Sequence, residues 1–190
     1  MTNKPQKQDL SLEDKKKILA ESGIIVGAVL LLCYFFGFSY IWNTGYGSEA
    51  SANGWNYIFA LITNNYKGTG ALYGDIAVPF NYYAKIYVRV LAVFVFVSFI
   101  ILIAFIISSC LNIKTFNKKL ETLTIVILYV LAAVFLGCII TALTMNGSKI
   151  LPKFCSSNPQ CSIATLAFFP FFITLGTAIG HTIFVYKNEL

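Results

Sequence analysis

Four long runs of apolar residues divide the chain, and polar residues gather between them. The runs cover about residues 18–42, 84–110, 122–145 and 162–186. A helix rises about 1.5 Å per residue, so about 20 apolar residues are needed to cross a hydrocarbon core of about 30 Å. Each run reaches that length, and none alternates between polar and apolar positions as strands of a membrane barrel do. The pattern predicts an all-α integral membrane protein, a bundle of four transmembrane helices.

The first run is too long for the apolar part of a cleavable signal peptide, which spans about 7 to 15 residues. We therefore expect it to remain in the membrane as a helix.

Basic residues indicate how this bundle is oriented. Nine of the 14 Lys and Arg residues fall in the tail over 1–17, the connection over 111–121 and the end over 187–190. The remainder lie in or beside the connections over 43–83 and 146–161. Cytoplasmic segments carry the excess of Lys and Arg in membrane proteins. We therefore expect both termini to be cytoplasmic, with a longer first and a shorter second outer loop, in the plasma membrane.

Composition supports a membrane location and excludes several other classes of protein. Hydrophobic residues make up 57% of the chain and charged residues 12%. A soluble domain of this length needs a more polar surface, because large exposed apolar patches promote association. The net charge of +6 is spread over termini and loops rather than gathered in one basic patch, so we expect no nucleic-acid partner. The lipid bilayer is the expected environment.

The first outer loop, over 43–83, is rich in Tyr and also contains Trp55. Both residue types favour the boundary between membrane and water. Trp55, Ile58, Phe59 and Ile62 recur at helical spacing, which predicts a short interfacial helix over about 53–64. Its apolar face either lies on the outer leaflet and caps the bundle or docks a partner protein, since interfaces are also enriched in aromatic residues.

Two cysteines, Cys155 and Cys161, lie in the second outer loop, where a disulfide can persist. Pro159 between them favours a turn. A structural disulfide is the expected state, with free thiols or a redox pair as alternatives. The spacing is not C-x-x-C, and no His accompanies it, so we expect no metal site there.

Ionisable residues inside spans are costly and therefore candidates for function. Glu21 in the first span and His181 in the fourth both fall near the cytoplasmic end. Each lies beside a G-x-x-x-G motif, which lets helix backbones approach closely. Gly23 and Gly27 in the first span match Gly180 and Gly176 in depth. We expect these two spans to pack through their glycines with Glu21 and His181 adjacent.

This arrangement has alternatives at each residue. The glycine motifs also suit a homodimer or a partner helix. Glu21 can instead reach the interface beside Lys17, four residues earlier on the same helix face. A structural role for Glu21 and His181 and a proton-handling role both remain open, the second because histidine titrates near neutrality.

Lys85 and Arg89 lie four residues apart at the outer end of the second span. Long basic side chains at this depth extend to the phosphate groups of the outer leaflet. Asp75 is a candidate ion-pair partner. Contact with an anionic lipid or solute is the functional alternative.

The sequence favours a protein that acts by contact, as an accessory or scaffold subunit of a larger membrane complex. No H-E-x-x-H or G-x-S-x-G motif occurs, so we assign no catalytic residue and expect neither a metal nor a cofactor. Transporters carry polar groups near the midplane, which the second span lacks almost entirely. An oligomeric channel lined by threonines of the third and fourth spans, or a component of a small-solute transporter, is the main alternative, and a membrane-embedded enzyme is less favoured. The expected partner is a membrane protein or further copies of the chain.

In layout the chain resembles the claudin-like four-span membrane proteins, which have cytoplasmic ends and a longer first outer loop. The resemblance is architectural. The Trp and Cys signature of that family's first loop is missing, because no Cys occurs between Asn43 and Tyr83. No residue roles are transferred from the family to this chain.

Overall fold

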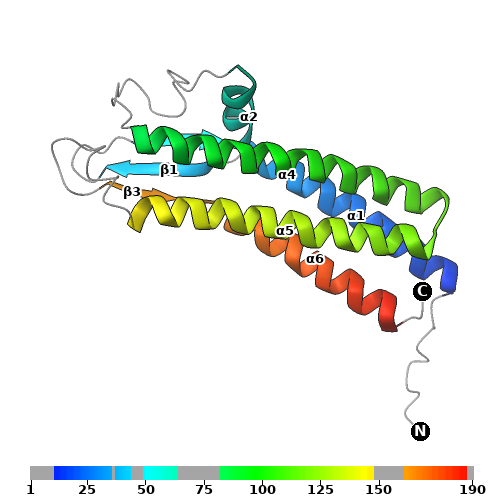
Figure 1. Ribbon diagram of the computed structural model, residues 1–190. Helices are drawn as coiled ribbons and strands as arrows, with labels where there is room; N and C mark the ends of the chain where they lie inside the picture. The colour runs from blue at the N-terminus through cyan, green and yellow to red at the C-terminus, as the bar shows by residue number, and fades with distance from the viewer. Residues whose placement is uncertain (1–10, 36, 44–48, 64–81, 148–160, 188–190) are drawn as a thin grey trace, which may run out of the picture.

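The computed structural model describes residues 11–35, 37–43, 49–63, 82–147 and 161–187. Its helices in these ranges are α1 (Leu12–Cys33), α2 (Gly54–Thr63), α4 (Tyr82–Lys114), α5 (Lys118–Gly147) and α6 (Phe168–Lys187). The four long helices lie side by side, and α2 packs against α4 toward one end of the bundle (Figure 1). The start of α1, the turn between α4 and α5, and the end of α6 all lie at the opposite end.

Within the described ranges, three helices are long and apolar enough to cross a membrane. The segments that meet this condition are Arg89–Lys114 in α4, Lys118–Thr144 in α5 and Phe168–Lys187, the whole of α6. Their length and composition indicate a membrane protein. The first helix, α1, is not one of the three, because Lys15, Lys16, Lys17 and Glu21 make its first half polar.

The first apolar run is helical only in part, which corrects the predicted helix over 18–42. After α1 ends at Cys33, the chain continues as strand β1 (Gly37–Asn43). Gly37 opens a stretch of aromatic and β-branched residues, which favour strands over helices. A continuous apolar run does not by itself distinguish a helix from a buried strand, so periodicity alone missed this boundary.

A small antiparallel sheet is therefore part of a fold that the sequence predicts to be all-α. Strands β2 (Glu49–Asn53) and β3 (Cys161–Ala164) flank β1, giving the order β2-β1-β3. The predicted fourth helix over 162–186 correspondingly begins later, at Phe168. The sheet joins the chain that follows α1 to the chain that precedes α6, so it fixes the same end of two helices that are distant in sequence.

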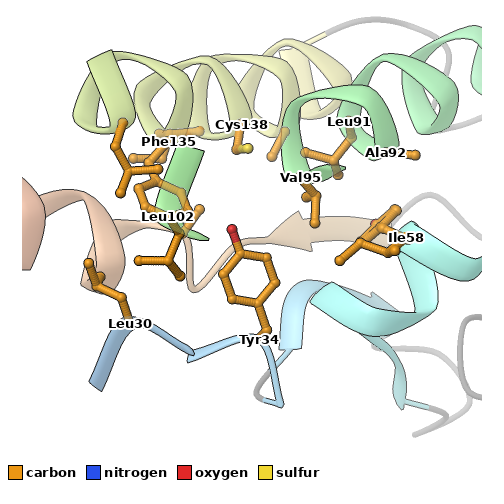
Figure 2. Packing of buried hydrophobic residues seen from close by; sticks show 14 of the residues in the cluster. Leu30, Tyr34, Ile58, Leu91, Ala92, Val95, Leu102, Phe135 and Cys138 are labelled. Atoms are coloured by element: carbon orange, nitrogen blue, oxygen red, sulfur yellow. The ribbon is translucent and has the colours of Figure 1, made fainter. Parts of the chain in front are cut away.

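Large apolar side chains fill the centre of the bundle. Figure 2 shows Leu30 from α1, Leu91 and Leu102 from α4, and Phe135 from α5 converging around Tyr34. The Tyr34 hydroxyl lies 2.6 Å from Ser98 Oγ. Because Ser98 gives its own proton to the carbonyl of Val95, the tyrosine is the donor to the serine. The one polar atom of this buried ring is therefore satisfied.

The two G-x-x-x-G motifs do not face each other, which corrects the predicted packing of the first and fourth spans. A Cβ on Gly23 would lie 2.6 Å from Ser109 Oγ, and one on Gly27 would lie 2.6 Å from Ile106 Cγ1. Both glycines therefore allow α1 to approach α4. Gly176 and Gly180 have open space beside them in α6. The two motifs lie at the same predicted depth in the bundle, but depth alone does not determine which helix each motif contacts.

This difference between the two motifs predicts opposite responses to a larger residue. We expect Gly23→Leu to lower the unfolding free energy by about 1 to 3 kcal/mol, because the new side chain must displace the side chains of Ser109 and Phe105 on α4. Gly176→Leu is the matched control and should change stability by about 0.5 kcal/mol or less. Thermal unfolding of both variants in one detergent measures the difference. Equal losses would contradict the assigned α1–α4 contact.

Candidate functional site

A buried carboxylate lies at the end of the bundle that carries the α4–α5 turn. Asn117 caps α5, since its Oδ1 accepts a hydrogen bond from the Lys119 backbone N–H at 3.0 Å. Glu121 follows in the first turn of α5, where the helix dipole favours negative charge. Its side chain turns inward and is only 2% exposed. The short turn and its cap therefore direct a carboxylate into the space between helices.

Three helices contribute to a chain of hydrogen bonds that starts at this carboxylate. Glu121 Oε1 lies 3.0 Å from His181 Nδ1 on α6. The other ring nitrogen, Nε2, lies 3.1 Å from Ser22 Oγ on α1. His181 is 5% exposed, and Ser22 is half-buried. We call Ser22, His181 and Glu121 the polar relay, because the imidazole connects a hydroxyl to a carboxylate.

Helix α4 supplies the second oxygen of Glu121 with a partner. Asn112 Nδ2 donates to Glu121 Oε2 at 2.8 Å and to Thr124 Oγ1 at 3.3 Å. Ser108 Oγ also hydrogen-bonds Thr124 Oγ1. Because Thr124 gives its proton to the Leu120 carbonyl, Ser108 is the donor in that contact. With both oxygens engaged, the carboxylate is fixed in orientation as well as in position.

Two buried polar atoms beside this network have no partner in the described part of the protein. They are Ser109 Oγ and the carbonyl oxygen Asn112 Oδ1, both on α4. Ser109 lies against Gly23 and stays outside the relay. An unpaired buried polar group costs about 1 to 3 kcal/mol, so these atoms are places where a water molecule would be stabilising.

The structure pairs His181 with Glu121 rather than with the predicted neighbour, Glu21. The Glu21 side chain points away from the core and lies 3.8 Å from Lys17 Nζ, as the alternative interpretation of Glu21 anticipated. It therefore belongs to an exposed (i, i+4) ion pair. His181 does meet α1, but through Ser22, the residue next to Glu21.

Sequence reasoning missed Glu121 because it ended the predicted cytoplasmic connection at that residue. A signal was nevertheless present. Glu121, Thr124, Leu128 and Leu131 share one face of α5 at spacings of three or four, and all four are buried. Extending the apolar face by one turn toward the cap would have placed the carboxylate on it.

The predicted partner face of the first outer loop is divided between the core and the surface. Helix α2 occupies the segment where the sequence predicts a short helix. Ile58 is buried, and the Trp55 ring packs edge-on to Phe99 at a centroid distance of 5.1 Å. Phe59 and Ile62 remain 58% and 65% exposed. Half of the predicted face therefore attaches α2 to the bundle, and half is free to meet lipid or protein.

Several other predicted residues fall partly or wholly outside the described part of the chain. Cys155 lies outside it, and Cys161 is placed only as backbone in β3, so the predicted disulfide stays a prediction. Cys33, Cys110 and Cys138 are free thiols. Arg89 is an exposed residue of α4, whereas the Lys85 side chain is outside the described residues. Among the described residues, no group of three His, Cys, Asp or Glu side chains is suited to a metal ion.

Comparisons of the chain with protein-family models, with curated proteins and with solved structures gave no match.

The buried pair predicts a large loss of stability when one partner alone is removed. We expect His181→Leu to lower the unfolding free energy by about 3 to 5 kcal/mol, because Glu121 then keeps its burial without its hydrogen-bonded partner. The double variant His181→Leu/Glu121→Leu should recover part of that loss. Glu21→Gln is the control and should cost about 1 kcal/mol or less, since its ion pair is exposed. Denaturant unfolding in detergent measures all three variants. A double variant with a lower unfolding free energy than His181→Leu alone would refute the pairing.

Proposed function

We propose that the protein is a plasma-membrane protein with four spans, and that α1 crosses the membrane in addition to α4, α5 and α6. Support comes from the residues on both sides of α1. Leu19, Gly23 and Leu30 pack inward, while Ile25 and Leu32 are apolar and exposed. The stretch from Gly23 to Cys33 is apolar all round, and such a stretch needs an apolar environment on its outer side. From Ile18 to Cys33 it extends about 24 Å, most of the hydrocarbon thickness.

The proposed orientation has both termini in the cytoplasm. Basic residues of the described chain concentrate at the end of the bundle formed by the start of α1, the α4–α5 turn and the end of α6 (Figure 1). They are Lys15, Lys16, Lys17, Lys114, Lys118, Lys119 and Lys187. Lys16 also lies 5.1 Å from the centre of the Phe116 ring, which connects α1 to the turn. We name this side the lysine end.

Four spans and three spans predict different positions for the N-terminus. Epitope tags at the two ends should both be inaccessible to antibody in intact cells and accessible after permeabilisation. If α1 stays out of the membrane, the number of crossings is odd and one tag becomes accessible without permeabilisation. Surface labelling of singly tagged proteins, with a known outer-face protein as positive control, measures this.

We further propose that the protein acts by contact, as an accessory or scaffold subunit. The observation that supports this function most is the filled bundle centre, where Tyr34, Phe105 and Phe135 are completely buried. Such packing fills the interior of the described bundle with apolar side chains rather than with a polar path. Specificity must then come from surfaces that meet other molecules.

The threonines that suggested an oligomeric channel provide little support for a polar lining. Each hydroxyl donates to the carbonyl four residues earlier in its own helix, which satisfies it without a pore. These are Thr122, Thr124, Thr141 and Thr144 in α5 and Thr174 and Thr177 in α6. Contact therefore remains the better-supported proposal.

Within this proposal, the exposed side of α2 is the partner surface, because α2 lies at the end of the bundle opposite the lysine end. We expect Phe59→Ser/Ile62→Ser to reduce co-purification of a stoichiometric membrane partner at least tenfold in mild detergent. The matched control is Phe169→Ser/Phe172→Ser on α6, where both side chains are 63% exposed. Quantitative mass spectrometry of tagged protein from native membranes measures the partner. If the α2 variant and the α6 variant recovered equal amounts of the partner, α2 would face lipid and not the partner.

A further inference from the structure

Contact with a partner makes no use of the polar relay at the lysine end, although its geometry is specific. Ser22, His181 and Glu121 come from α1, α6 and α5, and each successive pair is within hydrogen-bond distance, at 3.1 and 3.0 Å. A hydroxyl on one imidazole nitrogen and a carboxylate on the other is the arrangement that activates a serine nucleophile in unrelated folds. That arrangement is recognised by geometry and not by position in the chain.

The neighbours of Glu121 help to set the imidazole in the orientation that such chemistry requires. Carboxylate oxygens only accept, so His181 Nδ1 donates to Oε1 while Asn112 donates to Oε2. A neutral ring with its proton on Nδ1 has Nε2 free as an acceptor facing Ser22. As the structure has it, the Ser22 hydroxyl donates to the Leu19 carbonyl at 2.7 Å, so it is not yet the donor to Nε2. Rotation of its one hydrogen about the Cβ–Oγ bond moves that hydrogen bond from the carbonyl to Nε2, which is the state that the proposed chemistry uses.

Exposure to solvent increases along the relay from Glu121 through His181 to Ser22. Glu121 is the most buried, His181 is slightly exposed, and Ser22 is half-buried. The base and the acid are therefore shielded from water, while the hydroxyl is the member that a second molecule can reach. A cluster that only joined helices would not require this gradient.

From these observations we propose that Ser22 is a catalytic nucleophile for long-chain acyl esters or thioesters with an anionic head group. Ile18 and Ile25 are exposed on α1 on either side of Ser22, so an acyl chain has apolar surface to lie along. Lys15, Lys16 and Lys17 precede them at the lysine end and complement an anionic head. The carbonyl of such a molecule lies between its chain and its head, and Ser22 likewise lies between the lysines and the apolar stretch of α1.

The reaction balances with water as the second substrate. Ser22 Oγ attacks the acyl carbonyl carbon while His181 Nε2 takes the hydroxyl proton, and Glu121 stabilises the resulting imidazolium. The carbon–oxygen or carbon–sulfur bond of the substrate breaks, and the leaving alcohol or thiol receives that proton from Nε2. Water then attacks the acyl-serine, giving one proton to Nε2 and releasing the fatty acid as Ser22 regains its hydrogen.

An alkyl fluorophosphonate tests the proposal directly, because it phosphonylates activated serines and releases fluoride. Full-length protein in lipid nanodiscs is incubated with a long-chain probe, and the adduct is located by peptide mass spectrometry. We expect one adduct, on Ser22, formed at least tenfold faster than with a short-chain probe. Absence of an adduct on Ser22 of the folded wild-type protein overturns the proposal without reference to any variant.

Variants separate activation from a structural role. His181→Gln should slow labelling by about a hundredfold or more, the contribution of a general base. Glu121→Gln should slow it as well, whereas Glu21→Gln, a matched acid outside the relay, should label at the wild-type rate. Circular dichroism and gel filtration identify variants that do not fold. Labelling of a folded His181→Gln protein at the wild-type rate would show that Ser22 is not activated, and the proposal would be wrong.

Discussion

The buried contact between Glu121 and His181 imposes the strongest constraint on how the helices assemble. A carboxylate and an imidazole that are nearly inaccessible to water are costly unless each finds a partner. Glu121 finds His181 and Asn112, and His181 finds Ser22. These residues belong to all four long helices, so satisfying one carboxylate fixes their relative rotation. Apolar side chains alone specify such rotation poorly, because many packings bury similar areas.

The rest of the bundle shows a division along its length. Large apolar side chains occupy the middle, where Tyr34 has its hydroxyl paired with Ser98. The sheet and α2 lie toward one end, and the polar relay lies at the other. Contact and acyl chemistry, as proposed, therefore involve opposite ends of the same helices. Each end has its own stabilising interactions, so a change at one need not disrupt the other.

The sequence predicted the features that depend on local pattern. Run length and composition located α4, α5 and α6, and periodicity located the helix in the first outer loop. It missed the strand after α1 because an apolar run that contains aromatic residues suits both structures. It missed the partner of His181 because contacts between helices depend on the rotation and the depth of each helix. The pattern of apolar residues does not reveal either one. His181 was identified as a candidate from the cost of burying it, whereas its neighbours required three-dimensional contacts.

The glycine motifs illustrate why the site depends on packing that involves no functional group. Gly23 has no side chain, so the α1 backbone can lie close to Ser109 on α4. Ser22 precedes Gly23, and its distance from His181 is set by where that close contact holds α1. A methyl group added at Gly23 would push α1 outward and lengthen the hydrogen bond between the Ser22 hydroxyl and the imidazole. The strength of a hydrogen bond falls steeply with distance and angle. Gly23 therefore acts on the relay through position alone, and the chemistry proposed for Ser22 depends on the absence of a side chain one residue away.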